Sequence, residues 1–348
     1  MMPVSSIVER PAPVAKRPHF DLDPVKGKHQ FPRARPGRES QTFGVNQERA
    51  GSRLDRFLMA RFPGFSRSFL QSLVKDGSVL VDGRRAKPSS PVGPQNEITV
   101  NLPEGAPREP EDLDLVVVYR DDFVIAINKR PGLVVHPSRG HRTGTVLQGL
   151  FHIFREELKR DPLLNVGPVH RIDMGTSGVL LCSWGNQTRN FIQSQFEHRK
   201  VRKSYLAIVH GEPDWTEAET DRPIGIETRE KKRMAVDGFD AKSALTSVTK
   251  LSAGGDFALV RAKPHTGRMH QVRVHLAHLG HPLVGDELYG GRREDESGRP
   301  LLDRAALHSE SITFFHPGTG EPMTISAPLW DDMRAFLTKH GMPVPKGV

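Results

Sequence analysis

The 348-residue sequence contains one cysteine, Cys182, and this scarcity limits its chemistry. A single thiol cannot form a disulfide within the chain and cannot supply a cysteine-rich zinc site. Cys182 follows the apolar residues 179–181, so we expect it to be a small buried side chain. No run approaches 18 apolar residues, and residues 1–9 lack the apolar segment of a signal peptide. We therefore expect a soluble cytoplasmic protein without a membrane segment.

Motifs for nucleotide cofactors, serine hydrolysis and metal binding are also missing. The sequence has no G-x-x-x-x-G-K-[ST] phosphate loop and no G-x-G-x-x-G that opens a helix. Residues 175–178 read Gly-Thr-Ser-Gly, which is not the G-x-S-x-G elbow of a hydrolase. Five histidines lie between His265 and His281, but none of their spacings gives the i, i+4 pair with an acidic partner that metal-binding helices use. We expect neither a cofactor nor a metal ion.

Acidic residues are outnumbered, since 50 Lys and Arg face 41 Asp and Glu and the formal charge is +9. A polyanionic partner such as nucleic acid is compatible with this excess. Residues 1–42 are basic and rich in proline, with few apolar side chains. Such a segment cannot bury enough surface to offset its ordering entropy. We expect a disordered arm, which serves either as a nucleic-acid tether or as an inert terminus.

Residues 43–103 have the pattern of a small folded module. Apolar residues at i, i+3, i+4 and i+8 predict a helix over 54–62, and a second helix follows from a cap at Ser66. Strands are expected at 79–84 and 98–100. The apolar faces of the two helices are Leu54, Phe57, Leu58 and Phe62, then Phe69, Leu70, Leu73 and Val74. Arginines lie on the other faces. A linker rich in proline and acidic residues spans 102–114.

Residues 104–340 alternate short strands and helices. We expect strands at 115–119, 123–127, 179–182 and 203–209, and helices at 145–157, 186–197 and 269–279. Because regular βαβ units are missing, the pattern favours an α+β fold over a doubly wound parallel sheet.

The loop 169–178 carries Asp173 two residues after Arg171 and directly before an apolar strand. A carboxylate on a loop that a sheet positions is a common placement for a catalytic group. The same residue types also favour turns, so Asp173 could equally organise the loop by local hydrogen bonds. These residues alone leave both interpretations open.

The segment 266–286 forms a second candidate element. Met269, Val272, Leu276 and Leu279 share one helical face, and Gly280 supplies a C-terminal cap. Arg268 then stands at the entrance of the helix, while His270 and Arg273 face elsewhere.

Several motifs in the same order resemble the RluA family of RNA pseudouridine synthases, and most closely its RluD branch. They are His170-Arg171-Ile172-Asp173 with Thr176-Ser177-Gly178, Tyr205 within 203–211, Gly267-Arg268 with His270-Gln271, Arg273 and His275, and 280–286 with Tyr289-Gly290. Residues 53–58, 66–68, 77–83 and 87–88 resemble an S4 RNA-binding domain. The resemblance implies an α+β catalytic domain with a central, mostly antiparallel sheet, preceded by an S4-like domain. Ile172 and Met174-Gly175 depart from the usual family residues, without removing a catalytic group.

The resemblance also implies roles for individual residues. Asp173 acts at the sugar, either on C1′ or as a base at C2′, Arg268 pairs with Asp173, and Tyr205 stacks on the base and transfers a proton at C5. Arg171 replaces the flipped nucleotide in the RNA stack. Further RNA contacts are implied for Arg273, His270, Leu276, Arg53, Arg56, Arg67 and Lys75.

The implied partner is RNA, namely bacterial large-subunit ribosomal RNA or a pre-ribosomal particle, bound by a monomer. Three alternatives remain: a non-catalytic S4-containing RNA-binding or ribosome-assembly protein, a synthase acting on transfer RNA, and a glycosidase or nucleosidase. A protein that only binds phosphate gains nothing from Asp173, and a glycosidase normally needs two carboxylates. The basic run 229–233 is either a phosphate contact or a solvated loop.

Overall fold

The computed structural model describes residues 39–47, 50–62, 67–102, 110–137, 141, 143–160, 166–228, 233–345 and 347. Four expectations lie outside these ranges in whole or in large part. They are the arm up to residue 38, the helix cap at Ser66, residues 103–109 of the linker and residues 229–232 of the basic run. The module near the N-terminus and the larger domain are described separately below.

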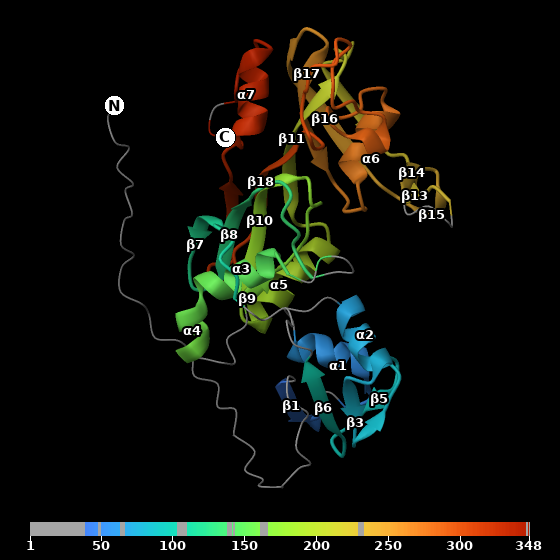
Figure 1. Cartoon of the computed structure of the whole chain (residues 1–348), viewed down its shortest axis with the longest axis vertical. Helices are drawn as coiled ribbons and strands as arrows, with labels where there is room; N and C mark the ends of the chain where they lie inside the picture. Colours follow the sequence, from blue (N-terminus) through green and yellow to red (C-terminus); the bar gives the residue numbers. More distant parts are fainter. Residues whose placement is uncertain are drawn as a thin grey trace. The chain divides into compact units, whose positions relative to one another are not determined.

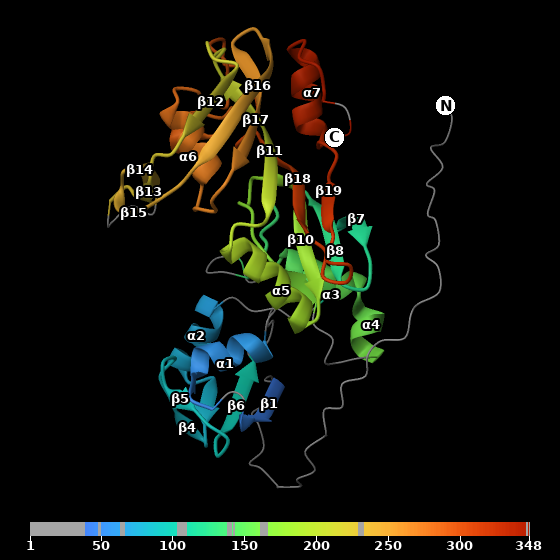
Figure 2. The same cartoon turned by 180° about the vertical axis from the view of Figure 1, so that it is seen from behind.

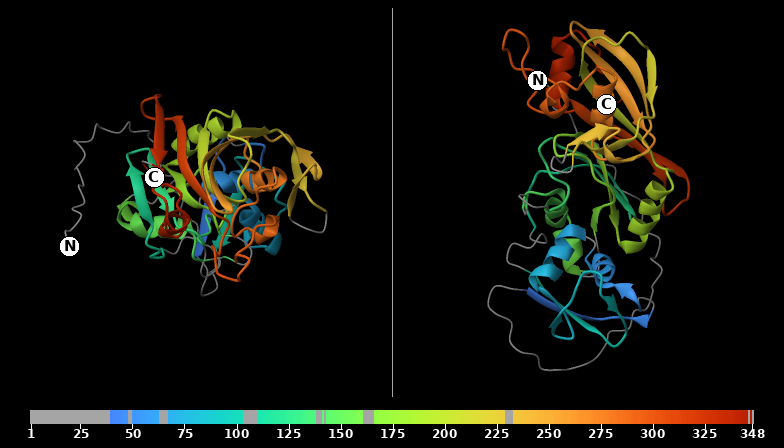
Figure 3. Two further views of the ribbon diagram at one scale, coloured as in Figure 1. Left: turned by 90° about the horizontal axis from the view of Figure 1, so that it is seen from above. Right: turned by 90° about the vertical axis from the view of Figure 1, so that its right-hand side faces the viewer.

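The N-terminal module contains α1 and α2, which lie on one face of a sheet with the strand order β1-β6-β3-β4 (Figures 1 and 3). Its elements are β1 (Glu39–Gly44), β2 (Ser52–Arg53), α1 (Leu54–Arg61), α2 (Arg67–Asp76), β3 (Val79–Val81), β4 (Arg84–Arg85), β5 (Pro91–Val92) and β6 (Glu97–Leu102). The strands β2 and β5 form a separate pair.

The expected apolar helix faces form the core of this module. All four predicted residues of α1 and its end are buried, and Leu70, Leu73 and Val74 of α2 are buried with them. Phe69 is partly buried against the same cluster. The helical periodicity therefore predicted this core correctly.

The strand β1 corrects one expected boundary. We predicted a disordered arm up to residue 42, but Glu39–Gly44 pairs antiparallel with Glu97–Leu102. This strand has few apolar residues, so its sequence gave little sign of a structured segment. Its backbone groups are satisfied by β6, a partner more than 50 residues away that local composition cannot reveal.

The larger domain is built around one sheet with the strand order β12-β16-β17-β11-β18-β10-β8-β7, while β9 pairs with β10 and β19 with β18 (Figures 1 and 2). The strands are β7 (Val116–Arg120), β8 (Val124–Lys129), β9 (Val166–Pro168), β10 (Ser177–Trp184), β11 (Arg202–His210), β12 (Glu217–Thr220), β16 (Thr246–Gly254), β17 (Phe257–Pro264), β18 (Leu307–Phe315) and β19 (Pro322–Ser326). Neighbouring strands are antiparallel except β10 and β18, which are parallel. The predicted α+β fold with a mostly antiparallel central sheet is confirmed.

Helices cover both faces of this sheet. They are α3 (Val146–Ile153), α4 (Arg155–Arg160), α5 (Asn186–Glu197), α6 (Gln271–His278) and α7 (Asp331–Lys339), with the short 3-10 helix η2 (Glu287–Tyr289). A smaller sheet, β13 (Ile224–Ile226), β14 (Met234–Val236) and β15 (Phe239–Lys242), has the order β14-β13-β15. No helix in the described ranges is long and apolar enough to span a membrane.

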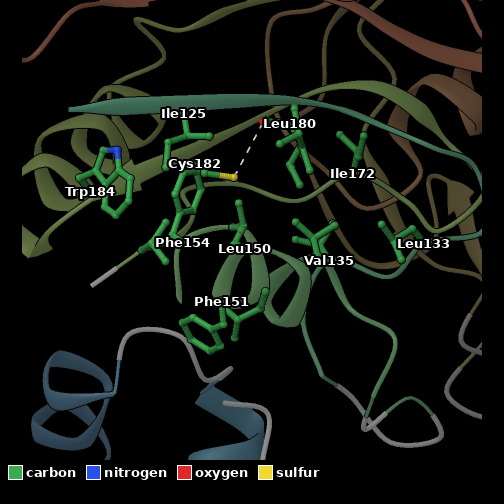
Figure 4. Packing of buried hydrophobic residues seen from close by; sticks show 14 residues of the cluster. Ile125, Leu133, Val135, Leu150, Phe151, Phe154, Ile172, Leu180, Cys182 and Trp184 are labelled. Atoms are coloured by element: carbon green, nitrogen blue, oxygen red, sulfur yellow. Dashed lines mark hydrogen bonds between the residues drawn. The ribbon is translucent and has the colours of Figure 1, made fainter. Parts of the chain in front are cut away.

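Strand β10 shows how the two faces are filled. Leu180 and Cys182 pack in one cluster with Leu150 of α3 and with Phe154, the residue that follows α3 (Figure 4). The alternate residues of β10 belong to a second cluster that includes Ile192 of α5. Cys182 is fully buried, as predicted, and burial raises the pKa of its thiol.

Candidate active site

A pocket of about 400 Å³ lies where the loop between β9 and β10 meets β11 and the segment that leads into α6. Its lining residues are Val169, His170, Arg171, Ile172, Asp173, Thr176, Phe196, Lys203, Tyr205, Pro264, Thr266, Gly267, Arg268, Met269, His270, Gln271, Val272, Arg273 and Leu307. Asp173, Tyr205 and Arg268, which the sequence selected as catalytic candidates, therefore share one pocket with Arg171, His270 and Arg273.

The strand order explains why Asp173 and Tyr205 meet. Strand β18 lies between β11 and β10, and its Ser309 pairs with Tyr205 on one side and with Gly178 on the other. A Cβ at Gly178 would lie 2.2 Å from the Ser309 carbonyl oxygen, and Gly178 has φ +102°. Only glycine permits this close approach, which places the end of the Asp173 loop against β18, the strand that pairs with Tyr205 on its other side.

The Asp173 loop is anchored in the core by the residue before it. Ile172 is 7% exposed and packs in the same cluster as Val135, Leu150 and Leu180 (Figure 4). The Asp173 carbonyl oxygen accepts a hydrogen bond from the Thr176 amide at 3.1 Å. A loop fixed by a buried side chain and a turn holds its carboxylate in a defined position.

Two cations also bind the backbone directly after Asp173. Lys129 is fully buried and its Nζ donates to the carbonyl oxygens of Met174, Arg130 and Leu133, each at 3.0 Å. Burial, together with the charge of nearby Arg304, lowers the pKa of Lys129 to about 7, although the Asp173 charge acts in the opposite direction. Arg304 donates from Nη1 to the Gly175 carbonyl oxygen at 3.1 Å. Sequence reasoning assigned a role to neither cation.

Arg273 is the arginine that contacts Asp173. Its Nη1 lies 3.4 Å from Asp173 Oδ2, while Nε and Nη2 each donate at 2.7 Å to the two oxygens of Asp286. Asp286 is 1% exposed, and the Arg273 guanidinium lies over the Tyr289 ring at 5.0 Å. Burial opposes the charge on Arg273, but the hydrogen bonds to Asp286 and the charges of Asp286 and Asp173 raise its pKa overall.

The expected pair between Arg268 and Asp173 is wrong. Arg268 lines the pocket, but its Nε donates to the Ser243 carbonyl oxygen at 2.9 Å. Arg268 precedes α6, which starts at Gln271, two residues later than predicted, and the Arg268 amide donates to Gln271 Oε1 at 3.0 Å, so local contacts hold this segment. Arg273, which we expected to face elsewhere, lies on the helical surface turned toward Asp173.

His270, the residue directly before α6, has an unusual backbone conformation. Its φ is +57°, in the left-handed region, and its Nδ1 lies 2.7 Å from the Tyr289 hydroxyl. His270 Nε2 is 3.9 Å from Asp173 Oδ2. Burial lowers the pKa of His270, while the Asp173 charge acts in the opposite direction. The resulting cluster joins α6, η2 and the Asp173 loop.

Tyr205 extends from β11 into the pocket. Burial raises the pKa of its hydroxyl, the Asp173 charge raises it further, and a hydrogen bond with the Ser309 side chain opposes both. The phenol is therefore held in its neutral form, in which the hydroxyl can donate a proton or a hydrogen bond.

Arg171 and Leu276 differ in whether they can reach a ligand. Arg171 is exposed at the pocket. Leu276 is fully buried between α6 and the sheet, in a cluster with Ala207 and Val260. The expected contact of Leu276 with RNA is therefore wrong, because helical periodicity marks a core residue and a ligand-facing residue in the same way.

The four candidate residues of the N-terminal module lie on α1, α2 or directly before α1. Arg53 and Arg67 donate to the buried carboxylate of Asp55, at 3.1 Å and 2.9 Å. Their side chains remain 45% and 52% exposed. Arg56 and Lys75 are exposed. The structure therefore presents all four cations to solvent and fixes two of them through one acid.

Several residues of the site were missed by sequence reasoning. Asp286 and Tyr289 lie in a quoted motif, but their contact with Arg273 depends on how η2 packs on α6. Lys203 begins the quoted motif 203–211 but received no role there, and Lys129 and Arg304 had no periodic signal that separated them from other cations. Among the described residues, no group of three or more His, Cys, Asp or Glu could hold a metal ion.

Comparisons with known proteins agree with this geometry. The RNA pseudouridylate synthase profile matches residues 123–278, and the S4 domain profile matches residues 52–98. An uncharacterized RNA pseudouridine synthase of Bacillus subtilis is 36% identical over 296 residues, which are 84% of this chain and 95% of the relative. The ribosomal large subunit pseudouridine synthase D of Xanthomonas campestris is 36% identical over 308 residues, with coverage of 84% and 90%. Among solved structures, human RNA pseudouridylate synthase domain containing 1 is 28% identical with a TM-score of 0.51, covering 65% of this chain and 89% of that one.

Proposed function

The chain belongs to the RNA pseudouridylate synthase family, and on that premise we propose that it isomerises uridines of bacterial large-subunit ribosomal RNA. The observation that carries the proposal is the convergence of Asp173, Tyr205 and Arg273 in one pocket. The choice of RNA is supported by relatives named for the large ribosomal subunit, at 36% identity over 84% of the chain. We further propose that it acts as a monomer in the cytoplasm, where bacterial ribosomal RNA is found.

The reaction rearranges one nucleotide without adding or removing atoms. The N1–C1′ bond breaks, the uracil rotates, and a bond forms between C5 and C1′. N1 gains a proton and C5 loses one, so the step needs no oxidant, reductant or water. The sugar develops positive charge as its bond to the base breaks, and a carboxylate beside it stabilises that charge.

Asp173 is the group that acts on the sugar. It is anchored by the core at Ile172 and by the Arg273 guanidinium, whose Nη1 lies 3.4 Å from Asp173 Oδ2 and helps to orient the carboxylate. Attack at C1′ and proton removal at C2′ are both open to this carboxylate. Tyr205 supplies a ring on which the base stacks and a neutral hydroxyl for proton transfer at C5.

The remaining cations bind the RNA. Arg171 is exposed at the pocket and its planar guanidinium can occupy the gap that a flipped nucleotide leaves in the stack. Arg268 lies at the pocket and serves the RNA rather than Asp173. We infer that residues 43–103 are a separate S4 RNA-binding domain and residues 104–340 the catalytic domain, with Arg53, Arg56, Arg67 and Lys75 as phosphate contacts.

Mapping pseudouridine in ribosomal and transfer RNA tests the proposal. Cells that lack the protein should lose signal only in large-subunit RNA, and the wild-type gene should restore it. Asp173→Asn should not restore it, although its RNA affinity should stay near that of the wild type, because the amide keeps the shape and loses the charge. Asp122→Asn, an exposed Asp in the turn between β7 and β8, is the matched control and should restore the signal.

The remaining outcomes each decide one part of the proposal. Signal lost only from transfer RNA would refute the substrate and keep the chemistry. Signal lost from neither RNA would favour a protein that binds RNA without modifying it. Normal activity of Asp173→Asn would refute the role of Asp173.

A further inference from the structure

Lys203 places a positive charge in the pocket, and the proposed roles of Asp173 and Tyr205 do not use this charge. It lies two residues before Tyr205 on β11 and lines the same pocket. Its Nζ donates to the Thr266 carbonyl oxygen at 2.7 Å, which fixes the ammonium in place. An ammonium has three N–H donors, so two remain for a ligand.

The acids of the pocket are already engaged elsewhere. Asp173 is the one carboxylate among the lining residues, and it lies 3.4 Å from Arg273. Asp286 binds Arg273 through both oxygens. The ion pairs of the described residues do not include Lys203, and burial lowers the pKa of its ammonium to about 8. A partly buried cation without an anion is costly, so an anion supplied by the substrate would stabilise it.

The surroundings of Lys203 keep the ammonium rigid. The Thr266 hydroxyl donates to Gln271 Oε1 at 2.7 Å, and Gln271 in turn holds the Arg268 amide and the Leu245 carbonyl oxygen. A Cβ at Gly267 would lie 3.9 Å from Lys203 Nζ, so little side chain covers this part of the pocket. The ammonium is thus held firmly at the lining of the pocket.

From this geometry we infer that Lys203 binds a phosphate of the RNA backbone at the target uridine. The inference rests on the proposed function, because it takes the ring of Tyr205 as the platform for the base. Two strand residues span roughly 7 Å, so Lys203 is displaced from the base along β11. A nucleotide carries its phosphate on the sugar, away from the base, and a fixed ammonium makes short charge-assisted hydrogen bonds to phosphate oxygens.

The test combines a protein change with an RNA change. Each RNA stem-loop contains one target uridine. An uncharged methylphosphonate replaces the phosphate either on the 5′ side or on the 3′ side of that uridine. Dissociation constants and single-turnover rates are measured for the wild type, Lys203→Gln and Lys203→Arg. Lys263→Gln, an exposed lysine on β17, is the matched control.

At one of the two linkages, the methylphosphonate should weaken wild-type binding roughly tenfold or more, as expected for one charge-assisted contact. Lys203→Gln should lose the same factor on unmodified RNA and nothing further at that linkage. Lys203→Arg should recover most of the affinity, and Lys263→Gln should behave as the wild type. For Lys203→Gln, the slope of log Kd against log salt should decrease by the amount that corresponds to one phosphate contact.

Either of two results would overturn the inference. One is a wild type that tolerates both methylphosphonates, which needs no variant and so does not depend on variant folding. The other is that the affinity losses caused by Lys203→Gln and by the methylphosphonate multiply at both linkages. Lys203 would then contact the base or the ribose. Both results can occur while unmodified RNA still receives pseudouridine, so they are distinct from a failure of the proposed function.

Discussion

At the scale of single residues, Arg273 is shared between two carboxylates of different exposure. Asp286 is 1% exposed and takes two hydrogen bonds at 2.7 Å, whereas Asp173 is 27% exposed and lies at 3.4 Å. The buried acid fixes the guanidinium, and the guanidinium in turn orients the acid that faces the pocket. A planar fork is required, because one ammonium cannot span both acids.

Arg273→Lys should therefore reduce the single-turnover rate by at least about tenfold, since it keeps the charge and loses the fork. RNA affinity should change much less than the rate. Rates and dissociation constants are compared with those of Arg293→Lys, an exposed arginine that pairs with Glu287 at the surface. Equal losses in rate and affinity would show that Arg273 binds RNA and does not orient Asp173.

Lys129 gives a prediction about stability and pH. Burial lowers its pKa to about 7 in the folded protein, whereas an unfolded lysine has a pKa of about 10.4. Between these values the unfolded chain binds one more proton than the folded chain, so this residue makes stability rise with pH and makes it fall as pH drops toward 7. Below pH 7 both forms are protonated and the contribution is constant.

Urea unfolding of the wild type and Lys129→Met at pH 7.5, 8.5 and 9.5 should show this linkage. The free energy of unfolding of the wild type, relative to Lys129→Met, should rise by about 1.4 kcal/mol per pH unit across this window. A difference that does not depend on pH would mean that Lys129 stays charged in the folded protein.

At the scale of elements, local pattern predicted more of the fold than of the site. The predicted bounds of α5 match the structure, and the strands expected at 115–119 and 123–127 appear as the antiparallel pair β7 and β8. The start of α6 was wrong, because Gln271 uses its side chain to bind the Arg268 amide and the turn at His270 is left-handed. Such contacts join residues through side chains, which a periodic pattern does not record.

The helices of the S4 domain depend on one buried acid. Asp55 is fully buried and accepts hydrogen bonds from Arg53, Arg67 and Gln71. These hydrogen bonds, of which the one from Arg53 has the largest effect, hold the pKa of its carboxyl well below the usual range. Two half-exposed arginines are therefore held at fixed positions on one surface. Fixed cations lose less entropy when they bind phosphate.

Asp55→Asn should lower the stability of this domain by roughly 1–2 kcal/mol, a value reduced because its arginine partners are half exposed. It should also weaken RNA binding, although it removes a negative charge that would otherwise repel RNA. Filter binding and thermal melting are measured beside Glu97→Gln, an exposed acid of the same domain. Tighter binding by Asp55→Asn would mean that overall charge, and not the fixed arginines, governs RNA affinity.

At the scale of the whole molecule, Arg304 connects the Asp173 loop to α7. Its Nε and Nη2 donate to the two oxygens of Asp332, while its Nη1 donates to the Gly175 carbonyl oxygen at 3.1 Å. Asp332 lies in the first turn of α7 and also accepts a hydrogen bond from the Met333 amide. A helix remote in sequence thus helps to fix the Asp173 loop.

Asp332→Asn should lower the rate between about tenfold and about a hundredfold through a displaced loop, and leave the RNA dissociation constant unchanged. Asp331→Asn, the exposed acid next to it in the same turn, should keep the wild-type rate. Single-turnover assays on both variants, with melting curves to show that each is folded, separate the two residues. An unaltered rate for Asp332→Asn would mean that the ion pair between Arg304 and Asp332 has only a structural role.

The position of β18 between β11 and β10 also has a consequence for the time at which the enzyme becomes active. Tyr205 and the Asp173 loop are both synthesised more than 100 residues before Ser309, the residue that brings them together. Domains form as the chain leaves the ribosome, N-terminal parts first. The S4 domain can therefore fold and meet RNA early in translation, whereas the pocket cannot assemble until β18 has emerged. A nascent chain of this enzyme should hold RNA before it can modify it.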